Sequence, residues 1–144
     1  MKVVIDTNVL ITCFWKGSVF RSLVQKSNLE LYAPAYALEE IRKHREEIRK
    51  KVRLPLVEFA KTLQDLHMLV TFVSLHEYSQ HFSEVLAIAK HFPHSENEIL
   101  NDIDFLALAV HLDCLLWSND ALLKRQPLVS VVTTKEFILL LAEI

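Results

Sequence analysis

The chain has 144 residues, of which 51% are hydrophobic and 24% are charged, and its formal net charge is −2 at pH 7. This length and this hydrophobic fraction predict a single domain with a full core, spanning residues 1–144. The slightly acidic balance argues against a surface coated in positive charge for bulk nucleic-acid binding, although it leaves room for a local basic patch.

Apolar runs and helical spacing predict strands that alternate with helices along the chain. The expected elements, in chain order, are a strand over 3–5, a helix over 20–26, a strand over 29–32, a helix over 34–52, a helix over 55–66, a strand over 69–73, a helix over 77–91, a loop over 94–101, a buried helix over 102–112, a strand over 115–117, a helical turn over 120–125, a strand over 130–132, and a final helix that Thr133 caps and that runs to Ile144. Such alternation is typical of a parallel sheet covered by helices on both faces.

Two acidic residues lie just after predicted strands. Asp6 directly follows the strand over 3–5, and Asp120 comes shortly after the strand over 115–117. Both are therefore expected at the carboxyl ends of the strands, where ligands bind in parallel sheets. The simpler alternative for Asp6 is a turn or cap residue, and Asp120 could equally cap the helical turn that follows it.

Three further acids belong to predicted helices. Glu40 directly precedes Ile41, at the border of a buried stripe, and could either reach over the end of the sheet or remain a solvated boundary residue. Asp102 and Asp104 open the buried helix. They could cap this helix and interact with its positive end, or they could bring two negative charges toward the sheet.

Carboxylates that converge on one pocket repel one another. Two of them about 4–5 Å apart repel by roughly 3–4 kcal/mol at an effective dielectric constant near 20, so a cluster of ionised acids needs a cation. Oxygen ligands of this kind suit Mg²⁺ or Mn²⁺ rather than zinc. Such ions commonly cleave phosphodiesters by activating water and stabilising the leaving oxygen.

Four short motifs, in a fixed order, give the chain a family resemblance. They are Val-Ile-Asp-Thr-Asn-Val-Leu at 4–10, Ala-Leu-Glu-Glu-Ile at 37–41, Asp-Ile-Asp-Phe-Leu-Ala-Leu-Ala at 102–109 and Leu-Leu-Trp-Ser-Asn-Asp at 115–120. With these motifs at these spacings, nearly the whole chain resembles a PIN domain. The resemblance implies an α/β fold, a three-layer α/β/α sandwich with a central, mostly parallel sheet, and it implies metal-dependent endoribonuclease activity.

The resemblance also implies roles for individual residues. The implied catalytic acids are Asp6, Glu40, Asp102 and Asp120. The implied ligands of Mg²⁺ or Mn²⁺ are Asp6, Asp102, Asp120 and, as an additional acid beside the third position, Asp104. Asn8 and Ser118 match the small polar positions that usually support the first and fourth acids, and Ser118 replaces the more usual threonine.

Many single-domain members of this size are VapC-type toxins, which usually form homodimers and are blocked by an antitoxin in the acidic groove. The resemblance therefore implies RNA as the substrate, an antitoxin as a possible partner and a homodimer. No role at a membrane is expected, because no apolar run reaches the length of a membrane span. A non-catalytic PIN-like module that binds RNA or protein is the alternative. A phosphatase would usually carry Asp-x-Asp after the first strand, and a dinucleotide enzyme would need a Gly-rich loop there, but this chain has Asp-Thr-Asn.

Positive charge concentrates just after the second of these motifs. The residues expected to contact RNA phosphates are Arg42, Lys43, Arg45 and Arg49. An ordinary solvated helix face with interleaved glutamates is an equally good interpretation of this segment. Phe14 and Trp15 could stack on a base, although we favour core packing or a dimer face for both.

The remaining signals concern the cellular compartment. Cys13 and Cys114 have no CxxC partner, which indicates free thiols in a reducing environment. No apolar run reaches about 18 residues, and Asp6 interrupts the N-terminus before a signal-peptide core could form. We therefore expect a cytoplasmic protein.

Overall fold

The computed structural model describes residues 1–15, 17–26 and 28–143. Its centre is a five-stranded sheet in which all neighbouring strands run parallel, in the order β3-β2-β1-β4-β5. The strands are β1 (Lys2–Ile5), β2 (Glu30–Pro34), β3 (Val70–Val73), β4 (Leu115–Trp117) and β5 (Val131–Val132). In the central strand β1, Val3, Val4 and Ile5 are completely buried, as expected for an apolar run in a sheet that is covered on both faces.

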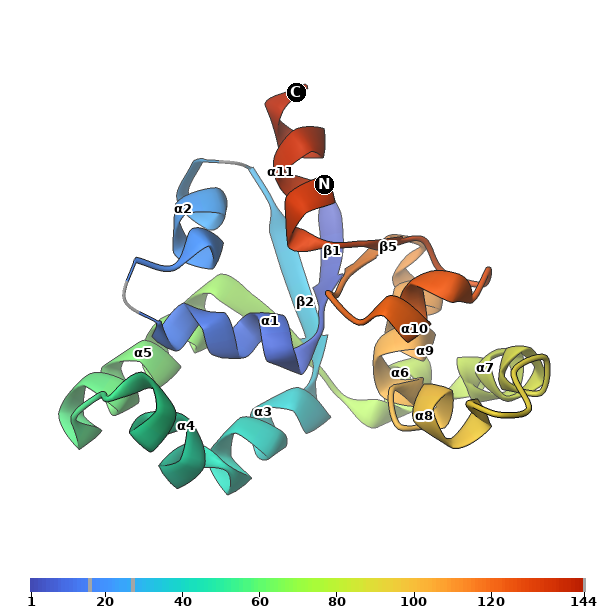
Figure 1. Ribbon diagram of the computed structural model, residues 1–144, viewed down its shortest axis with the longest axis horizontal. Helices are drawn as coiled ribbons and strands as arrows, with labels where there is room; N and C mark the ends of the chain where they lie inside the picture. The colour runs from blue at the N-terminus through green and yellow to red at the C-terminus, as the bar shows by residue number, and fades with distance from the viewer. Residues whose placement is uncertain (16, 27, 144) are drawn as a thin grey trace.

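Helices connect the strands and cover both faces of the sheet. They are α1 (Thr7–Ile11), the 3-10 helix η1 (Thr12–Phe14), α2 (Val19–Lys26), α3 (Ala35–Lys43), α4 (Arg45–Val52), α5 (Leu56–Leu69), α6 (Leu75–Tyr78), the 3-10 helix η2 (Ser79–His81), α7 (Phe82–Ala89), α8 (Glu96–Leu100), α9 (Ile103–Leu112), α10 (Ala121–Arg125) and α11 (Thr134–Ala142). In Figure 1, α1, α2 and α5 lie on one side of the sheet and α6 to α9 lie on the other. This arrangement confirms the predicted α/β/α sandwich.

The two helical layers pack on the sheet through different side chains. In one layer, α9 packs across β1, β2 and β4, and all residues from 105 to 109 are buried. On the other side of the sheet, the ring of Trp117 stacks on Phe20 and Phe137, with centroid distances of 5.5 and 4.7 Å. These three aromatic rings tie α2 and α11 to β4, one of the strands that carry the site.

The helix predicted over 34–52 is wrong in two details. Pro34 does not open the helix but ends β2 and occupies the N-cap position of α3. The helix then breaks at His44 (φ −102°, ψ 18°), which separates α3 from α4. This break lets α4 turn along the edge of the site rather than continue straight from α3.

Other differences also concern short helices. The segment 94–101, predicted as a loop, contains α8, which buries Ile99. The helix predicted over 77–91 consists of α6, η2 and α7, and neither α1 nor η1 was predicted. The final helix begins after its predicted cap Thr133 and ends at Ala142, while Ile144 lies outside the described residues. None of the helices in the described part of the chain is long and apolar enough to cross a lipid bilayer.

Candidate active site

The candidate site lies at the carboxyl edge of the sheet, next to the central strand. Strand β1 pairs with β2 on one side and with β4 on the other, and Ile5 is in register with Trp117. The Asp6 N–H donates to the Trp117 carbonyl at 3.0 Å, which extends the strand pairing by one residue. Strand order reverses beside β1, because β2 and β3 lie on one side of it and β4 and β5 lie on the other. The crevice at such a reversal is the usual ligand site of a parallel sheet.

Asp6 is held at this edge but is poorly neutralised. It is only 7% exposed, and the fully buried Ser118 donates its hydroxyl to Asp6 Oδ2 at 2.7 Å. Burial raises the pKa of the Asp6 carboxyl, and the negative charge of Asp120 raises it further. The hydrogen bonds from Ser118 and from the Thr7 backbone only partly oppose this rise.

Glu40 reaches the same edge from α3. The Thr7 hydroxyl donates to Glu40 Oε1 at 3.1 Å and so connects α1 with α3. Burial raises the pKa of Glu40, the hydrogen bond from Thr7 lowers it, and the charge of Asp6 adds to the rise. One helical turn before Glu40, Tyr36 has a raised pKa, chiefly because of the Glu40 charge. Its hydroxyl therefore stays protonated beside the acids.

Asp102 approaches the other acids from the start of α9. It occupies the N-cap position but makes no side-chain capping hydrogen bond. Helix capping therefore does not explain why an aspartate stands at this position. Its pKa is raised to about 7, first by burial and then by the negative charges of Asp6, Asp120 and Glu40. Acids from four separate segments of the chain therefore lie near enough for the charges of the other three to act on Asp102.

Asp120 caps a helix and also takes part in this group of acids. Its Oδ1 accepts a hydrogen bond from the Leu122 N–H at 2.8 Å, as the capping interpretation predicts. Its charge still acts on both Asp6 and Asp102. The Asp120 N–H donates to Ser118 Oγ at 3.1 Å, so the Ser118 hydroxyl connects the first and the fourth acid.

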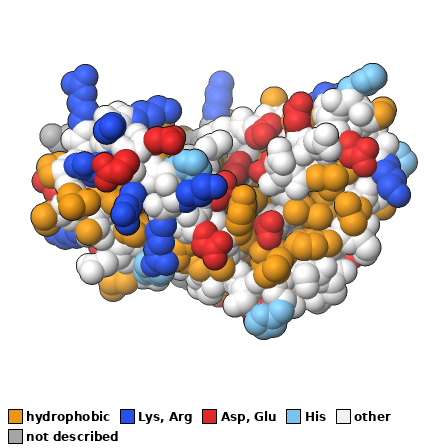
Figure 2. Space-filling model, turned by 90° about the horizontal axis from the view of Figure 1, so that it is seen from below, with side chains coloured by type: hydrophobic (Ala, Val, Ile, Leu, Met, Phe, Trp, Pro, Cys, Tyr) orange, Lys and Arg blue, Asp and Glu red, His pale blue; other side chains and the backbone are white. Residues whose placement is uncertain are grey.

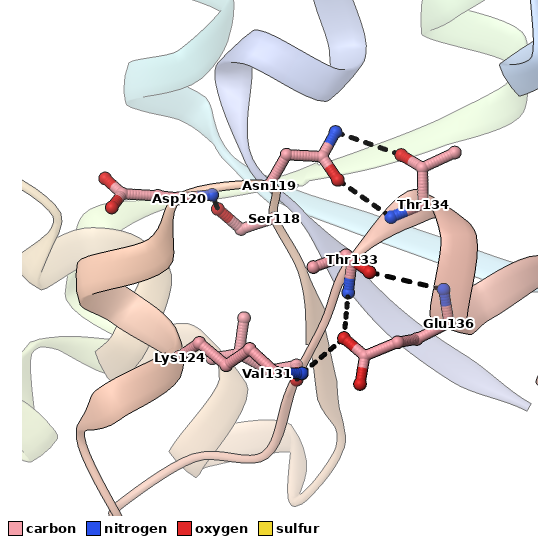
Figure 3. A network of polar contacts seen from close by, with 8 residues as sticks. All are labelled: Ser118, Asn119, Asp120, Lys124, Val131, Thr133, Thr134 and Glu136. Carbon is pink, nitrogen blue, oxygen red and sulfur yellow. Dashed lines mark hydrogen bonds and ion pairs between the residues drawn. The ribbon is translucent and has the colours of Figure 1, made fainter.

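The loop that carries Asp120 is fastened to α11, as Figure 3 shows. The Asn119 side chain donates to Thr134 Oγ1 at 3.0 Å and accepts from the Thr134 N–H at 2.8 Å. Lys124 of α10 forms an ion pair with Glu136 in the first turn of α11. These contacts fix the direction in which the loop presents Asp120.

Asp104 lies in the first turn of α9, next to the group. The hydroxyl of the buried Tyr78 donates to Asp104 Oδ1 at 2.6 Å. The Asp104 charge contributes to the raised pKa of Glu40. Asp104 is therefore near enough to act on the other acids, while Tyr78 fixes one of its two oxygens.

Three of the predicted acids, Asp6, Glu40 and Asp102, border a cleft of about 870 Å³ between α1, α3, α4 and the start of α9. Asp104 and Asp120 are not among the described residues that line it. Its lining includes the acids Asp6, Glu40, Glu47 and Asp102, the aromatic residues Trp15 and Tyr36, and the basic residues His44 and Lys51. Figure 2, which shows this end of the molecule, has acidic side chains across the face, most of the lysine and arginine side chains in its left half, and most of the hydrophobic side chains in its right half. The cleft is thus mixed in character, with negative charge concentrated at the end of the sheet.

The four residues predicted to contact RNA lie outside this lining, as far as the described part of the chain extends. Arg42 contacts a histidine ring nitrogen at 3.4 Å, and Arg49 forms an ion pair with a glutamate at 3.0 Å. Lys43 and Arg45 are exposed. Lys51 of α4, in the same basic segment, lines the cleft instead.

The donor chemistry of the site fits Mg²⁺ or Mn²⁺. Within residues 1–15, 17–26 and 28–143, no three His, Cys, Asp or Glu side chains lie close enough together to hold an ion by themselves. Mg²⁺ usually keeps several waters and binds through one or two carboxylates together with substrate phosphates, so acids around an open cleft suit a hydrated ion. The pKa values of Asp6, Glu40 and Asp102 are raised first by burial and then by neighbouring negative charge. A dication would offset both effects by stabilising the charged carboxylates.

Several residues that shape the site were missed by sequence reasoning. In α1, the residue that supports an acid is Thr7, whose hydroxyl donates to Glu40. Asn8, which was predicted to play such a role, is exposed and lines the cleft without a side-chain hydrogen bond among the described residues. Tyr36 has a usable sequence signal, because it lies one helical turn from a candidate acid. Tyr78 and Asn119 have no such signal, since their partners are distant in sequence.

Comparisons with known proteins agree with this geometry. A family model described as PIN domain matches residues 4–137. No curated protein sequence matches the chain. The chain is similar to a chain in the crystal structure of VapBC2 from Rickettsia felis bound to a DNA fragment from their promoter, with a TM-score of 0.67 and 15% identity, over 92% of this chain and 98% of that chain. Because the family model covers nearly the whole sequence, this protein belongs to the PIN domain family.

Proposed function

We propose that residues 1–144 form one nuclease domain, a metal-dependent endoribonuclease that hydrolyses RNA phosphodiester bonds in the cleft. The observation that carries this proposal is the gathering of acids around the half-buried Asp102, whose pKa is raised to about 7 by burial and then by the charges of Asp6, Asp120 and Glu40. Holding like charges together lowers the stability of a fold, and such perturbed groups concentrate at functional sites. A cation that brings the phosphate to these acids accounts for the arrangement.

Asp6, Asp102 and Asp120 would hold the ion, and Asp104 would add a further carboxylate. When bound, Mg²⁺ or Mn²⁺ supplies an activated water at neutral pH and stabilises the leaving oxygen. Membership of the PIN domain family and the oxygen-only donors both support this choice of cofactor.

The chain's own hydrogen bonds orient the acids for this role. Ser118 holds Asp6 by Oδ2, and Thr7 holds Glu40 by Oε1. The other oxygen of Glu40 can then hold a water molecule in the cleft and accept a proton from it. The exposed Arg42, Lys43 and Arg45, together with the half-buried Arg49, would guide RNA toward the cleft from outside, because phosphate contacts do not need to lie at the reacting bond.

The test is cleavage of structured and unstructured RNA by purified protein in Mg²⁺, in Mn²⁺ and in EDTA. We expect cleavage only with metal, and we expect Asp6→Asn to abolish it while keeping the wild-type fold by circular dichroism. Glu30→Gln, at an exposed position at the opposite end of the sheet, is the matched control and should cleave normally. Full activity of Asp6→Asn, or full activity in EDTA, would refute the proposal. RNA binding without cleavage under any metal condition would favour the non-catalytic module.

We also propose that the protein is the toxin of a toxin–antitoxin pair and forms a homodimer. The resemblance to VapC-type toxins and the similar fold in the VapBC2 complex support an antitoxin partner. Ile138 and Leu139 of α11 are 41% and 61% exposed and offer apolar surface for a second copy. Light scattering of the wild type and of Leu139→Asp tests the dimer. Inhibition of cleavage by the product of a neighbouring small gene tests the antitoxin.

A further inference from the structure

Trp15 is the most exposed aromatic side chain of the cleft. It is 48% exposed, whereas the other tryptophan, Trp117, is 1% exposed. Its neighbour Phe14 is 2% exposed and stacks on Phe59 at 4.6 Å, and the Trp15 N–H donates to the Thr12 carbonyl at 3.1 Å. The backbone is thus anchored to the core, while the indole lies in the wall of the cleft.

Trp15 also lies between the cleft and a second hollow. This hollow, of about 410 Å³, shares Trp15 and Val52 with the cleft. Its charged lining residues are Arg21, Arg53, Lys61, Glu58 and Asp65, so basic side chains outnumber acidic ones. A nucleic-acid strand that leaves the acids and passes over Trp15 therefore meets a region that suits its phosphates better than the acids do.

We propose that Trp15 is a stacking platform for an unpaired base of an RNA strand that runs from the acids past the indole to Arg53 and Lys61. This inference rests on the proposed function, because it takes RNA as the ligand. Bases in a duplex already stack on one another, so an indole in a wall can stack only on a base that is unpaired. Helices α1 and η1 place Trp15 roughly 13 Å along the chain from Asp6, so the stacked base is separate from the reacting phosphate.

The experiment measures binding in an Asp6→Asn background with Mg²⁺, where RNA stays intact. The probes are a single-stranded 12-nucleotide RNA, the same sequence as a duplex, and a dinucleotide. We expect the single strand to quench Trp15 fluorescence and to shield it from acrylamide, and we expect the duplex to do neither. The buried Trp117 adds a constant background.

Substitutions then separate stacking from general surface effects. Trp15→Ala should weaken binding of the 12-nucleotide strand by between about 5-fold and 150-fold and should leave dinucleotide binding unchanged. Trp15→Tyr should restore most of the affinity, whereas Trp15→Leu should not. Val19→Ala is the matched control, because Val19 is also 48% exposed and lines neither hollow among those described.

Salt dependence gives an independent result. Arg53→Gln and Lys61→Gln should each lower the slope of log affinity against log salt by about 0.7, while the Trp15 variants should leave the slope unchanged. Equal affinities for wild type, Trp15→Ala and Trp15→Leu would overturn the proposal, as would equal quenching by duplex RNA. Because no cleavage is needed, failure of the nuclease proposal leaves these measurements interpretable.

Discussion

Neutralising Asp102 should stabilise the metal-free protein at neutral and alkaline pH, even though it should abolish cleavage. The folded-state pKa of Asp102 is about 7, against 3.8 for an ordinary aspartate. A group with a raised folded-state pKa contributes stability below the unfolded-state pKa and loses it as the pH rises through the folded-state pKa. Charging Asp102 therefore costs stability between about pH 4 and pH 7.

The size of this effect follows from the same pKa values. The full difference corresponds to about 4 kcal/mol, but the partly exposed carboxylate can relax into water, so a net gain of about 1–2 kcal/mol is expected. This gain should raise the melting temperature of Asp102→Asn by about 3–8 °C at pH 8. It should vanish at pH 4, where the folded wild type also carries a neutral Asp102.

The assay is thermal unfolding in EDTA at pH 4, 6 and 8, followed by circular dichroism. Glu30→Gln is the control for loss of an exposed carboxylate. Adding Mg²⁺ at pH 8 should stabilise the wild type more than Asp102→Asn, because an ion that binds only the folded state stabilises it by mass action. A metal-free Asp102→Asn that melts at or below the wild-type temperature at pH 8 would refute the reasoning.

Substitutions at three further positions test the supports of the site and its core. Ser118→Ala removes the hydroxyl that holds Asp6, so it should lower the free energy of unfolding at pH 8 by about 1.5–3 kcal/mol, measured by urea denaturation. Thr7→Val removes the donor to Glu40 with little change in shape; it should reduce the cleavage rate, and Thr7→Ser should restore it. Leu106→Ala, at a fully buried position of α9, should cost about 2–5 kcal/mol in the free energy of unfolding.

The sequence predicts best those elements that have one dominant physical cause. The apolar run of β1 and the all-round apolar helix α9 can each form only when buried, and both lie where expected. Thr133 and Glu136 form the capping box that begins α11, and its cap was predicted from residue type alone. Local chemistry decides these elements, so tertiary context does not change them.

The elements that were not predicted depend on packing. Ile41 and Ile48 are both buried and lie seven residues apart, which is two helical turns, so their spacing does not reveal the break at His44. Helix α8 is polar except for a few residues, and Ile99 is the residue that it buries. A periodicity of 3.6 cannot be detected from so short a segment.

The sequence placed Asp6 and Asp120 at the end of the sheet, because each comes just after a strand. It did not by itself bring Glu40 to them, since that requires the pairing of β1 with β2 and the direction of α3. The same limit applies to Thr7, which is 33 residues away from Glu40 in the chain. Family resemblance provided the list of acids, and only the fold shows how each one is held.

The hydrogen bonds at the site follow one pattern that links its stability to its proposed chemistry. A donor orients one oxygen in each of four acids, and these pairs are Ser118 with Asp6, Thr7 with Glu40, Tyr78 with Asp104 and the Leu122 N–H with Asp120. Asp6 also accepts a hydrogen bond from the Thr7 backbone. Lone pairs that these donors leave free can accept a water or an ion. Asp102 has no capping hydrogen bond, and its pKa is raised to about 7, first by burial and then by three of the other acids. Of these acids, Asp102 therefore has the greatest need of a bound cation to stay ionised. Protonation of Asp102 should compete most directly with metal binding near neutral pH.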